Sequence, residues 1–187
     1  MPRDEDFIRA RVPMTKKAVR DLACAMLEVR PDDIVFDVGS GTGAMTCALA
    51  RRASDSFVYA IEHDDDAYEL TLQNLEKLSA RNVIAVKNDA PHGMEAFPAP
   101  DKVFVGGSSG NLNSIVETVL QKNKTAEILV TAVSIDTLNE ATTLFKDKGM
   151  KTDIICANIS KARRLGNYDL MMAENPVYLI KGVSVEE

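Results

Sequence analysis

Short apolar runs alternate with amphipathic segments along most of the chain. The apolar runs predict strands over residues 34–38, 57–61, 83–86, 102–105 and 128–132. The amphipathic segments predict helices over residues 44–52, 65–78, 112–121 and 136–148, after a first helix that begins near Thr15. Strands this short and apolar are typical of a sheet that is buried on both faces. The alternation therefore predicts an α/β fold with a mostly parallel sheet between two layers of helices.

The order of elements changes after Gly149, a residue type that often ends a helix. Two further strands are predicted over residues 152–159 and 177–183, with no helix between them. We expect these strands to form an antiparallel C-terminal hairpin that closes one edge of the sheet. The chain is then one domain, 1–187, with an N-terminal segment and helix (1–30), cofactor-binding βα units (31–150) and the C-terminal hairpin (151–187).

Composition and charge disfavour several classes of protein. The chain has 187 residues and a formal net charge of −6, which disfavours a dedicated nucleic-acid binder. Its apolar runs fall far short of the roughly 20 residues that span a bilayer, and its charged start is unlike a secretory signal. Three cysteines without short spacing and only two histidines favour neither disulfides nor a metal centre. We therefore expect a cytoplasmic protein with no metal and no nucleic-acid or membrane partner.

Residues 36–44 carry most of the chemical information. They read Phe-Asp-Val-Gly-Ser-Gly-Thr-Gly-Ala, so a buried strand runs through a glycine-rich turn into a helix. Glycines at such a turn let backbone N–H groups approach a ligand closely. An acidic residue ends the next predicted strand, where its carboxylate can accept hydrogen bonds from both hydroxyls of a ribose. These features predict a nucleoside site made of Asp37, Gly39, Ser40, Gly41, Thr42, Gly43 and Glu62.

Two cofactors compete for this site, a nicotinamide dinucleotide and S-adenosylmethionine. Asp37 would repel the anionic pyrophosphate of a dinucleotide, whereas it would attract the cationic sulfur and the amino group of S-adenosylmethionine. The chain also lacks the Tyr-x-x-x-Lys pair of short-chain dehydrogenases. The spacing Asp-x-Gly-x-Gly-x-Gly therefore favours S-adenosylmethionine. The bland alternative is that the glycines only form a tight turn between strand and helix.

Two further loops are expected at the same edge of the sheet. In the first, Asp89 can accept a hydrogen bond from the amino group of adenine while the N–H of Ala90 reaches a ring nitrogen. A turn or helix cap before Pro91 is the alternative for this loop. The second loop is a candidate substrate floor, with a plain flexible loop as the alternative. It consists of Gly106, Gly107, Ser108, Ser109 and Gly110.

The chain also resembles a known family. The resemblance rests on Val-Pro-Met-Thr-Lys at 12–16, the glycine motif at 37–43, Asn-Asp-Ala-Pro at 88–91, Val-Phe-Val-Gly-Gly-Ser at 103–108 and Asn-Pro-Val at 175–177. In these motifs the chain is similar to the CbiT family, the decarboxylating C15-methyltransferases that act on cobalt-precorrin-6B in cobalamin biosynthesis. It is also similar to the C-terminal half of the fused precorrin-6Y methyltransferase. The likeness extends from about Asp4 to Lys181.

The resemblance implies a Rossmann-like class I methyltransferase fold, a homotetramer and a tetrapyrrole substrate, a corrinoid precursor. It also implies cofactor contacts at Thr15, at residues 39–43, at Glu62 and at Ala90. For Thr15, which lies at a predicted helix start, the alternative is that it is only the N-cap of that helix. Three segments, 123–126, 131–134 and 164–169, depart from the usual family pattern and concern the corrinoid contacts more than the cofactor site. Methyl transfer of this kind requires alignment of donor and acceptor and exclusion of water. It demands no catalytic dyad, so no catalytic residue is assigned.

Two other functions stay open on the sequence alone. A tRNA adenine-N1 methyltransferase has a similar fold and glycine motif, but its N-terminal RNA-binding module and its basic charge are missing from this sequence. A non-catalytic scaffold could keep the fold without the activity. The set of Asp37, Glu62 and Asp89 argues against a scaffold.

An acidic enzyme needs local positive charge to hold the carboxylates of a corrin precursor. Two clusters could supply it, and ordinary surface charge is the alternative for both. The first contains Arg9, Arg11, Lys16, Lys17 and Arg20, and the second contains Lys161, Arg163 and Arg164. Guanidinium groups pair with carboxylates through two hydrogen bonds at once. We therefore expect a loop carrying Arg163 and Arg164 to close over the tetrapyrrole beside residues 106–110.

Overall fold

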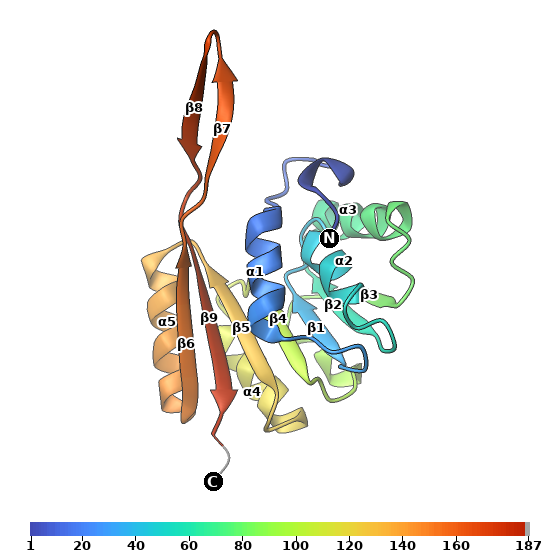
Figure 1. The fold of residues 1–187 in the computed structure, drawn as a ribbon. Coiled ribbons are helices and arrows are strands. Elements are labelled where there is room, and N and C mark those ends of the chain that lie inside the picture. The colour runs from blue at the N-terminus through green and yellow to red at the C-terminus, as the bar shows by residue number, and fades with distance from the viewer. Residues whose placement is uncertain (186–187) are drawn as a thin grey trace.

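The fold is built around one seven-stranded sheet that is flanked by helices (Figure 1). The computed structural model describes residues 1–185. In chain order the elements are the 3-10 helix η1 (Asp4–Asp6), α1 (Lys17–Leu27), β1 (Val35–Val38), α2 (Ala44–Ala50), β2 (Val58–Glu62), α3 (Asp65–Lys77), β3 (Val83–Lys87), the 3-10 helix η2 (Met94–Ala96), β4 (Lys102–Val105), α4 (Leu112–Lys122), β5 (Glu127–Ala132), α5 (Ile135–Asp147), β6 (Met150–Ala157), β7 (Ser160–Leu165), β8 (Tyr168–Ala173) and β9 (Val177–Ser184).

The strand order in this sheet is β3-β2-β1-β4-β5-β9-β6. Strands β1 to β5 run parallel to one another, whereas β9 runs antiparallel to both β5 and β6. The predicted α/β class with a mostly parallel sheet is therefore confirmed. The chain builds outward from β1 to β3 on one side and then continues with β4 on the other side. In sheets of this kind ligands bind at the carboxyl ends of the strands where the order reverses, which are β1 and β4.

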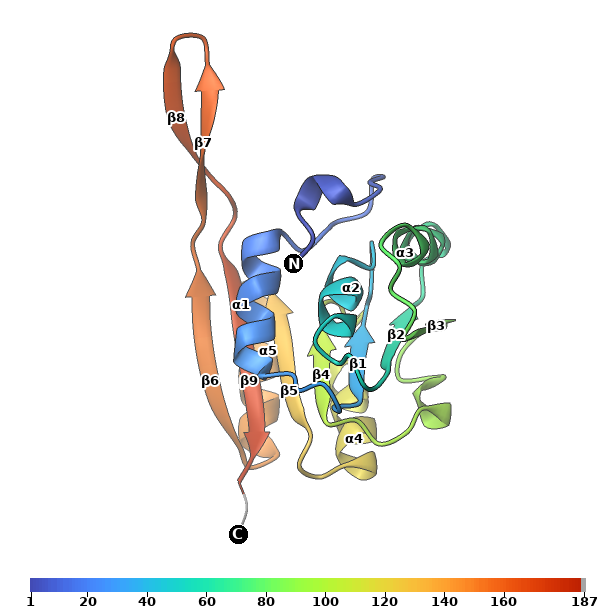
Figure 2. The same cartoon turned by 45° about the vertical axis from the view of Figure 1, so that its right-hand side comes forward.

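Helices cover both faces of the sheet. α1, α2 and α3 lie on one face, and α4 and α5 lie on the other (Figure 2). Alternate residues of β1 face the two layers, because Val35 packs in the cluster with α1 and α2, whereas Phe36 packs in the cluster with α4 and α5. Every residue of β1 and β4 is buried as a result, as predicted. The prediction is wrong for β3, an edge strand whose residues are exposed or only half-buried.

The predicted antiparallel pairing of the last two long strands is confirmed. β6 and β9 pair from Met150 opposite Ser184 to Ala157 opposite Val177. The connection between them, however, is not a loop. It folds into a second hairpin of β7 and β8 that projects away from the rest of the molecule (Figures 1 and 2). β7 was not predicted because all of its residues are exposed, so no pattern of apolar residues marks it as a strand in the sequence.

The first helix begins at Lys17, two residues after Thr15, as predicted. Thr15 is not its N-cap, since Lys16 occupies that position and makes no side-chain capping bond. The N–H of Lys17 instead donates to Oδ1 of Asp4 at 2.8 Å. A carboxylate thirteen residues away thus performs the capping predicted for Thr15. None of the helices within residues 1–185 is long and apolar enough to cross a membrane.

Candidate functional site

A cavity of about 1170 Å³ lies at the carboxyl ends of β1 and β4. Its walls are formed by residues 8–16, the glycine-rich loop after β1, the loops after β2, β4 and β5, one side of α3 and the segment before β9. A site for one small molecule typically encloses roughly 300–1,000 Å³. This cavity is therefore larger than a single small molecule requires, which leaves room for a second ligand beside a cofactor.

The glycine-rich loop has the geometry that its sequence predicts. Gly39, Gly41 and Gly43 have φ values of 72°, 59° and 72°, a region that glycine adopts without strain. A Cβ on Gly39 would lie 2.7 Å from the carbonyl oxygen of Gly107, so the loops after β1 and β4 cross too closely for any side chain. Gly43 instead packs against α3. The predicted residues that line the cavity from this loop are Gly39, Ser40, Gly41 and Thr42.

Glu62 ends β2 at the wall of the cavity, and only 6% of the residue is exposed. Its Oε2 accepts a hydrogen bond from the N–H of Gly41 at 2.8 Å. Its Oε1 accepts from the N–H groups of His63 at 2.9 Å and Asp64 at 3.0 Å. The carboxylate therefore fastens the glycine-rich loop to the loop after β2. Two ribose hydroxyls would have to share the remaining acceptor capacity of these two oxygens.

Asp37 is fully buried in β1 and is not among the described residues that line the cavity. Its Oδ2 accepts from the hydroxyl of Thr46 in α2 at 2.5 Å, whereas Oδ1 has no hydrogen-bond partner within residues 1–185. Burial raises the pKa of Asp37 to about 7, against the lowering effect of the Thr46 hydrogen bond and with a further rise from the charge of Glu62. Contact between Asp37 and a cationic cofactor group stays a prediction, and it requires that group to reach a carboxylate beneath the glycine-rich loop.

Asp89 and Ala90 lie beside Glu62, as an adenosine site requires. The three residues surround a recess of about 10 Å³ next to the main cavity. Such a volume holds a single water molecule, so an adenine ring would have to widen the recess. The carbonyl oxygen of Ala90 accepts from Nδ2 of Asn111 at 3.0 Å. Asn111 occupies the N-cap position of α4, but its amide makes this bond to the loop and no capping bond.

The candidate substrate floor is shorter than the sequence predicts. Gly106, Gly107 and Ser109 line the cavity, whereas Ser108 lines only the small recess. Gly110 lines neither space. The backbone after β4 therefore faces the cavity over a few residues, directly beside Gly39.

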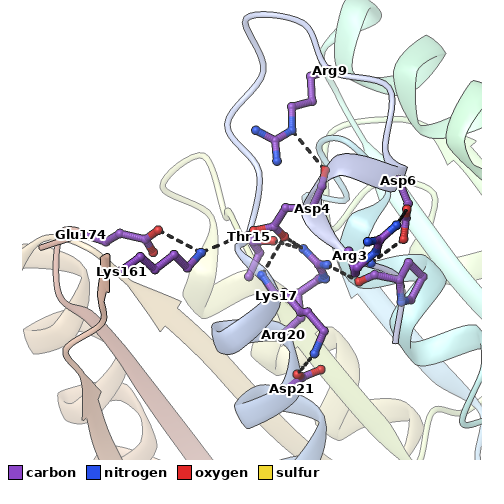
Figure 3. Close-up of polar contacts among 11 residues, drawn as sticks. Arg3, Asp4, Asp6, Arg9, Thr15, Lys17, Arg20, Asp21, Lys161 and Glu174 are labelled. Atoms are coloured by element: carbon purple, nitrogen blue, oxygen red, sulfur yellow. Dashed lines mark hydrogen bonds and ion pairs between the residues drawn. The ribbon is translucent and has the colours of Figure 1, made fainter. Parts of the chain in front are cut away.

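Thr15 lines the cavity as part of the N-terminal wall, and a buried arginine holds it there. The carbonyl oxygen of Thr15 accepts from Nη1 of Arg20 at 2.5 Å, and Nη1 also donates to Oδ1 of Asp4 at 2.8 Å (Figure 3). Arg20 is fully buried, and its Nη2 donates to the carbonyl oxygen of Pro2 at 2.8 Å. Its guanidinium carbon lies 4.9 Å from the centre of the Phe7 ring, a distance typical of a cation–π contact.

Lys161 extends this network to the base of the projecting hairpin. Its Nζ lies 3.2 Å from Oε1 of Glu174 and 3.8 Å from Oδ2 of Asp4 (Figure 3). Burial raises the pKa of Asp4, but the hydrogen bond and charge of Arg20 outweigh burial and leave that pKa below its ordinary value. Asp4 thus joins the N-terminal segment both to α1 and to β7 of the projecting hairpin.

The first predicted cationic cluster is only partly right. Its members that line the cavity are Arg9, Arg11 and Lys16. Arg20 is buried in the network just described and cannot form part of an exposed rim. Lys17 is held in an ion pair along α1, with its Nζ 2.5 Å from Oδ2 of Asp21.

The prediction that Arg163 and Arg164 lie in a loop beside residues 106–110 is wrong. Both belong to β7 of the projecting hairpin, where Nη1 of Arg164 lies 3.1 Å from Oδ2 of Asp169 in β8. Neither is among the described residues that line the cavity of this chain. The positions of these two arginines could not be predicted from the sequence, because no residue of the hairpin is buried and no apolar pattern marks its strands.

Several residues that line the cavity were not assigned to the site from the sequence. They are Thr131 near the end of β5 and Val133 after it, Asp66 and Glu69 in α3, Ile159 between β6 and β7, and Glu174 and Val177 near the start of β9. The residues after β5 carried a usable signal, because the carboxyl ends of parallel strands meet at one edge of the sheet. The residues between β6 and β9 carried no such signal, since their position at the cavity depends on how the antiparallel strands β6 and β9 pair.

The groups around the cavity fit S-adenosylmethionine. The crossing at Gly39 leaves backbone where a Cβ would otherwise fill the space. Glu62 lies between the cavity and the recess, and the unpaired oxygen of Asp37 adds a buried acidic group nearby. Two acidic groups suit a cationic ligand better than an anionic pyrophosphate. Within residues 1–185, no three His, Cys, Asp or Glu side chains are grouped so as to hold a metal ion.

Comparisons with known proteins agree with one another. The family described as "Precorrin methyltransferase domain" matches residues 7–183. A relative from Methanocaldococcus jannaschii named "Probable cobalt-precorrin-6B C(15)-methyltransferase (decarboxylating)" is 34% identical over 181 residues, which cover 96% of this chain and 96% of that protein.

Two solved structures are similar over nearly the whole chain. The precorrin-6y C5,15-methyltransferase of Geobacter metallireducens has a TM-score of 0.93 at 31% identity, covering 98% of both chains. The precorrin 8W decarboxylase of Methanobacterium thermoautotrophicum has a TM-score of 0.92 at 35% identity, covering 97% of this chain and 99% of that chain. These likenesses therefore include the sheet and the surroundings of the cavity.

Proposed function

The chain belongs to the precorrin methyltransferase family, and from that premise we propose that it is an S-adenosylmethionine-dependent cobalt-precorrin-6B C15-methyltransferase. The proposed reaction transfers a methyl group to C15 of a tetrapyrrole and removes the carboxyl group of the C12 acetate as carbon dioxide. The name of the Methanocaldococcus jannaschii relative supports both steps. We place the reaction in the cytoplasm, as part of cobalamin biosynthesis.

One structural observation carries the proposal. At the reversal of strand order, the glycine-rich loop crosses Gly107 at backbone distance and is fastened by the carboxylate of Glu62. The cavity beside this crossing has one wall of exposed arginines, Arg9 and Arg11, and another of loop backbone. The residues proposed to hold the nucleoside therefore adjoin a cavity whose size supports a second ligand and whose arginines suit a multiply carboxylated one.

The protein's part in the reaction is positioning. When bound, S-adenosylmethionine supplies an electrophilic methyl group on a cationic sulfur. Glu62 and the glycine-rich loop fix the nucleoside side of the cavity, while the backbone of Gly106 and Gly107 limits how far a planar ligand can approach. Met14 is half-buried and contributes apolar surface that would help to exclude water from the reacting atoms. The conjugated macrocycle can accept the electron pair left by carbon dioxide, so the proposal needs no catalytic dyad.

A direct test incubates the protein with S-adenosylmethionine and cobalt-precorrin-6B and follows both products by mass spectrometry. We expect S-adenosylhomocysteine and a tetrapyrrole that has gained one methylene and lost one carbon dioxide. A gain of the methylene alone would remove decarboxylation from the proposal. An unchanged tetrapyrrole, with methyl transferred to a tRNA transcript in a parallel reaction, would favour the tRNA adenine-N1 alternative. Cofactor binding without any transfer would favour a scaffold.

We also propose that the chain assembles as a homotetramer through the projecting hairpin. An isolated two-stranded hairpin is at best marginally stable in water, so β7 and β8 need a partner surface. The pairing of Leu165 with Tyr168 places four apolar side chains on one face of the hairpin. Each of them is at least 46% exposed in the single chain, and they are Leu165, Tyr168, Leu170 and Met172.

Light scattering after size exclusion tests this assembly with a matched pair of variants. Leu170→Glu places a charge on the apolar face and is expected to give a smaller species. Met171→Glu places the same charge on the opposite face of the same strand and is expected to leave the tetramer intact. A monomeric unmodified protein, or equal effects of the two variants, would contradict the proposed contact.

A further inference from the structure

Asn74 of α3 joins two walls of the cavity. Its side chain is fully buried, and all three of its hydrogen bonds go to backbone atoms. Oδ1 accepts from the N–H of Ile8 at 2.7 Å, and Nδ2 donates to the carbonyl oxygens of Ile8 at 3.0 Å and Thr42 at 2.9 Å. Ile8 begins the N-terminal wall, and Thr42 belongs to the glycine-rich loop. One amide therefore fixes these two walls relative to each other.

The N-terminal wall is held again at its far end, where Arg20 donates to the carbonyl oxygen of Thr15 at 2.5 Å. Between the two anchors lie residues 9–14, which we call the strap. The strap lines the cavity, in the part of the chain that runs between α3 and α1 in Figures 1 and 2. Within residues 1–185, residues 10–14 make no backbone hydrogen bond. The strap is thus fixed by hydrogen bonds at both ends, whereas within the described residues its middle is held only by packing, such as that of Met14 against the cluster around Phe7.

We propose that Asn74 is a positioning residue for the methyl transfer. It holds the strap in a fixed position relative to the glycine-rich loop. As a result, closure of the strap over the cavity and binding of the cofactor stabilise each other. The inference rests on the proposed function, since it takes the ligand beneath the strap to be S-adenosylmethionine or its product. Such coupling is reciprocal. A bound ligand must therefore protect the strap, and a weakened anchor must lower the affinity for the ligand.

The strap offers a direct readout of its own opening. Trypsin cleaves after Arg9 and Arg11, and cleavage of a folded protein reports local opening. The probe ligand is S-adenosylhomocysteine, which binds without reacting. Cleavage rates after these two arginines are measured with and without the probe, and the Kd of the probe is measured by calorimetry on the same preparations.

A matched pair of variants separates the anchor from general stability. Asn74→Asp keeps the size of the side chain and its acceptor for the N–H of Ile8, but it loses both donated hydrogen bonds. Asn82→Asp makes the same change at a side chain whose Nδ2 also donates only to carbonyl oxygens, at 2.8 to 3.1 Å, and which does not line the cavity. The acceptors of Asn82 are Ala50, Ala53 and Ser56.

We expect the probe to slow cleavage of the unmodified protein by about five-fold or more, a usual size for coupling between two sites. Asn74→Asp should speed cleavage without ligand and raise the Kd of the probe by about ten-fold. Asn82→Asp should change each quantity by less than about two-fold. In turnover with saturating cofactor, Asn74→Asp should lower kcat, whereas Asn82→Asp should not.

The two ways to fail can be told apart. If the probe binds but does not slow cleavage, or if the two variants behave alike, the role of Asn74 is overturned while the cofactor assignment stands. If the probe does not bind the unmodified protein, the cofactor assignment falls, and the inference falls with it.

Discussion

The hydroxyl of Thr46 donates a 2.5 Å hydrogen bond to Oδ2 of Asp37, between α2 and β1, and both residues are fully buried. The second carboxylate oxygen of Asp37 has no hydrogen-bond partner within residues 1–185. Burial is the main cause that raises the pKa of Asp37 to about 7. The charge of Glu62 raises this pKa further, whereas the hydrogen bond from Thr46 lowers it. Ionisation of Asp37 therefore costs free energy unless a cation lies nearby.

Asp37→Asn should change how stability depends on pH. The folded pKa of about 7 lies above the ordinary value of 3.8, so the stabilising contribution of protonated Asp37 is complete below pH 3.8 and is lost as pH rises through about 7. The Asn variant carries no such loss. Its free energy of unfolding should match the unmodified protein near pH 4 and exceed it near pH 8 by up to roughly 4 kcal/mol. Urea denaturation at several pH values measures the difference, and parallel profiles would contradict the raised pKa.

Glu62→Gln should weaken cofactor binding. The expected loss is about 1.5 to 3 kcal/mol for each charge-assisted hydrogen bond to a ribose hydroxyl that is no longer made. Glutamine is preferable to alanine because the carboxylate also accepts three backbone N–H groups, which alanine would leave without a partner. Calorimetry with S-adenosylmethionine, on protein whose fold is verified by circular dichroism, gives the Kd. An unchanged Kd would remove Glu62 from the cofactor site.

Thr15 and Asp4 should separate cofactor binding from stability. Since Asp4 caps the N–H of Lys17 and pairs with buried Arg20, Asp4→Ala should cost about 3 to 5 kcal/mol of unfolding free energy. Thr15→Ala removes no capping bond and should change stability by less than about 0.5 kcal/mol. It should nevertheless weaken cofactor binding if the hydroxyl contacts the ligand. Denaturation and calorimetry on both variants check this, and a loss of about 1 kcal/mol in Thr15→Ala would restore its capping role.

The sequence predicts the buried, parallel part of the fold well because its signals are local. Strands such as β4 are short apolar runs, and the turn at residues 39–43 needs glycine whatever surrounds it. β7 offers no such signal, since its charged and exposed residues form a strand only through pairing with β8. The bounds of the long helices follow from periodicity, whereas the cap of α1 depends on a carboxylate that only tertiary structure brings near.

The same limit applies to the candidate site. The glycine-rich loop and Glu62 could be placed at the carboxyl edge of the sheet because each directly follows a strand predicted from the sequence. Burial could not be foreseen for Arg20, which looks like its exposed neighbours in sequence but is enclosed by Asp4 and Phe7. Asn74 gave no signal either, because a polar residue on a helix is ordinary until the chain folds back to present the backbone of Ile8.

The last prediction concerns the charges that would hold the tetrapyrrole. Arg9 and Arg11 are exposed on the wall of the cavity, so the double change Arg9→Glu with Arg11→Glu reverses charge where substrate carboxylates would lie. We expect the KM for cobalt-precorrin-6B to rise by about ten-fold at low salt and by less at high salt, because exposed charges are screened within roughly 10 Å at 0.1 M ionic strength. The cofactor Kd should stay within about two-fold, since Glu62 and the glycine-rich loop are untouched.

Arg164→Glu is the control for this charge reversal, because Arg164 lies on the hairpin face opposite to that of Leu170. Arg164 is exposed on β7 and lies outside the lining of the cavity, so the KM of this variant should equal that of the unmodified protein. An increase in KM for Arg164→Glu would indicate that the hairpin contacts the substrate, presented by a neighbouring copy of the chain. If the double variant leaves KM unchanged at low salt, the N-terminal arginines do not hold the substrate. The cofactor Kd of the double variant could also worsen as much as its KM. In that case the double change has displaced the strap, and substrate binding is lost because the cavity wall has moved and not because the charges have been reversed.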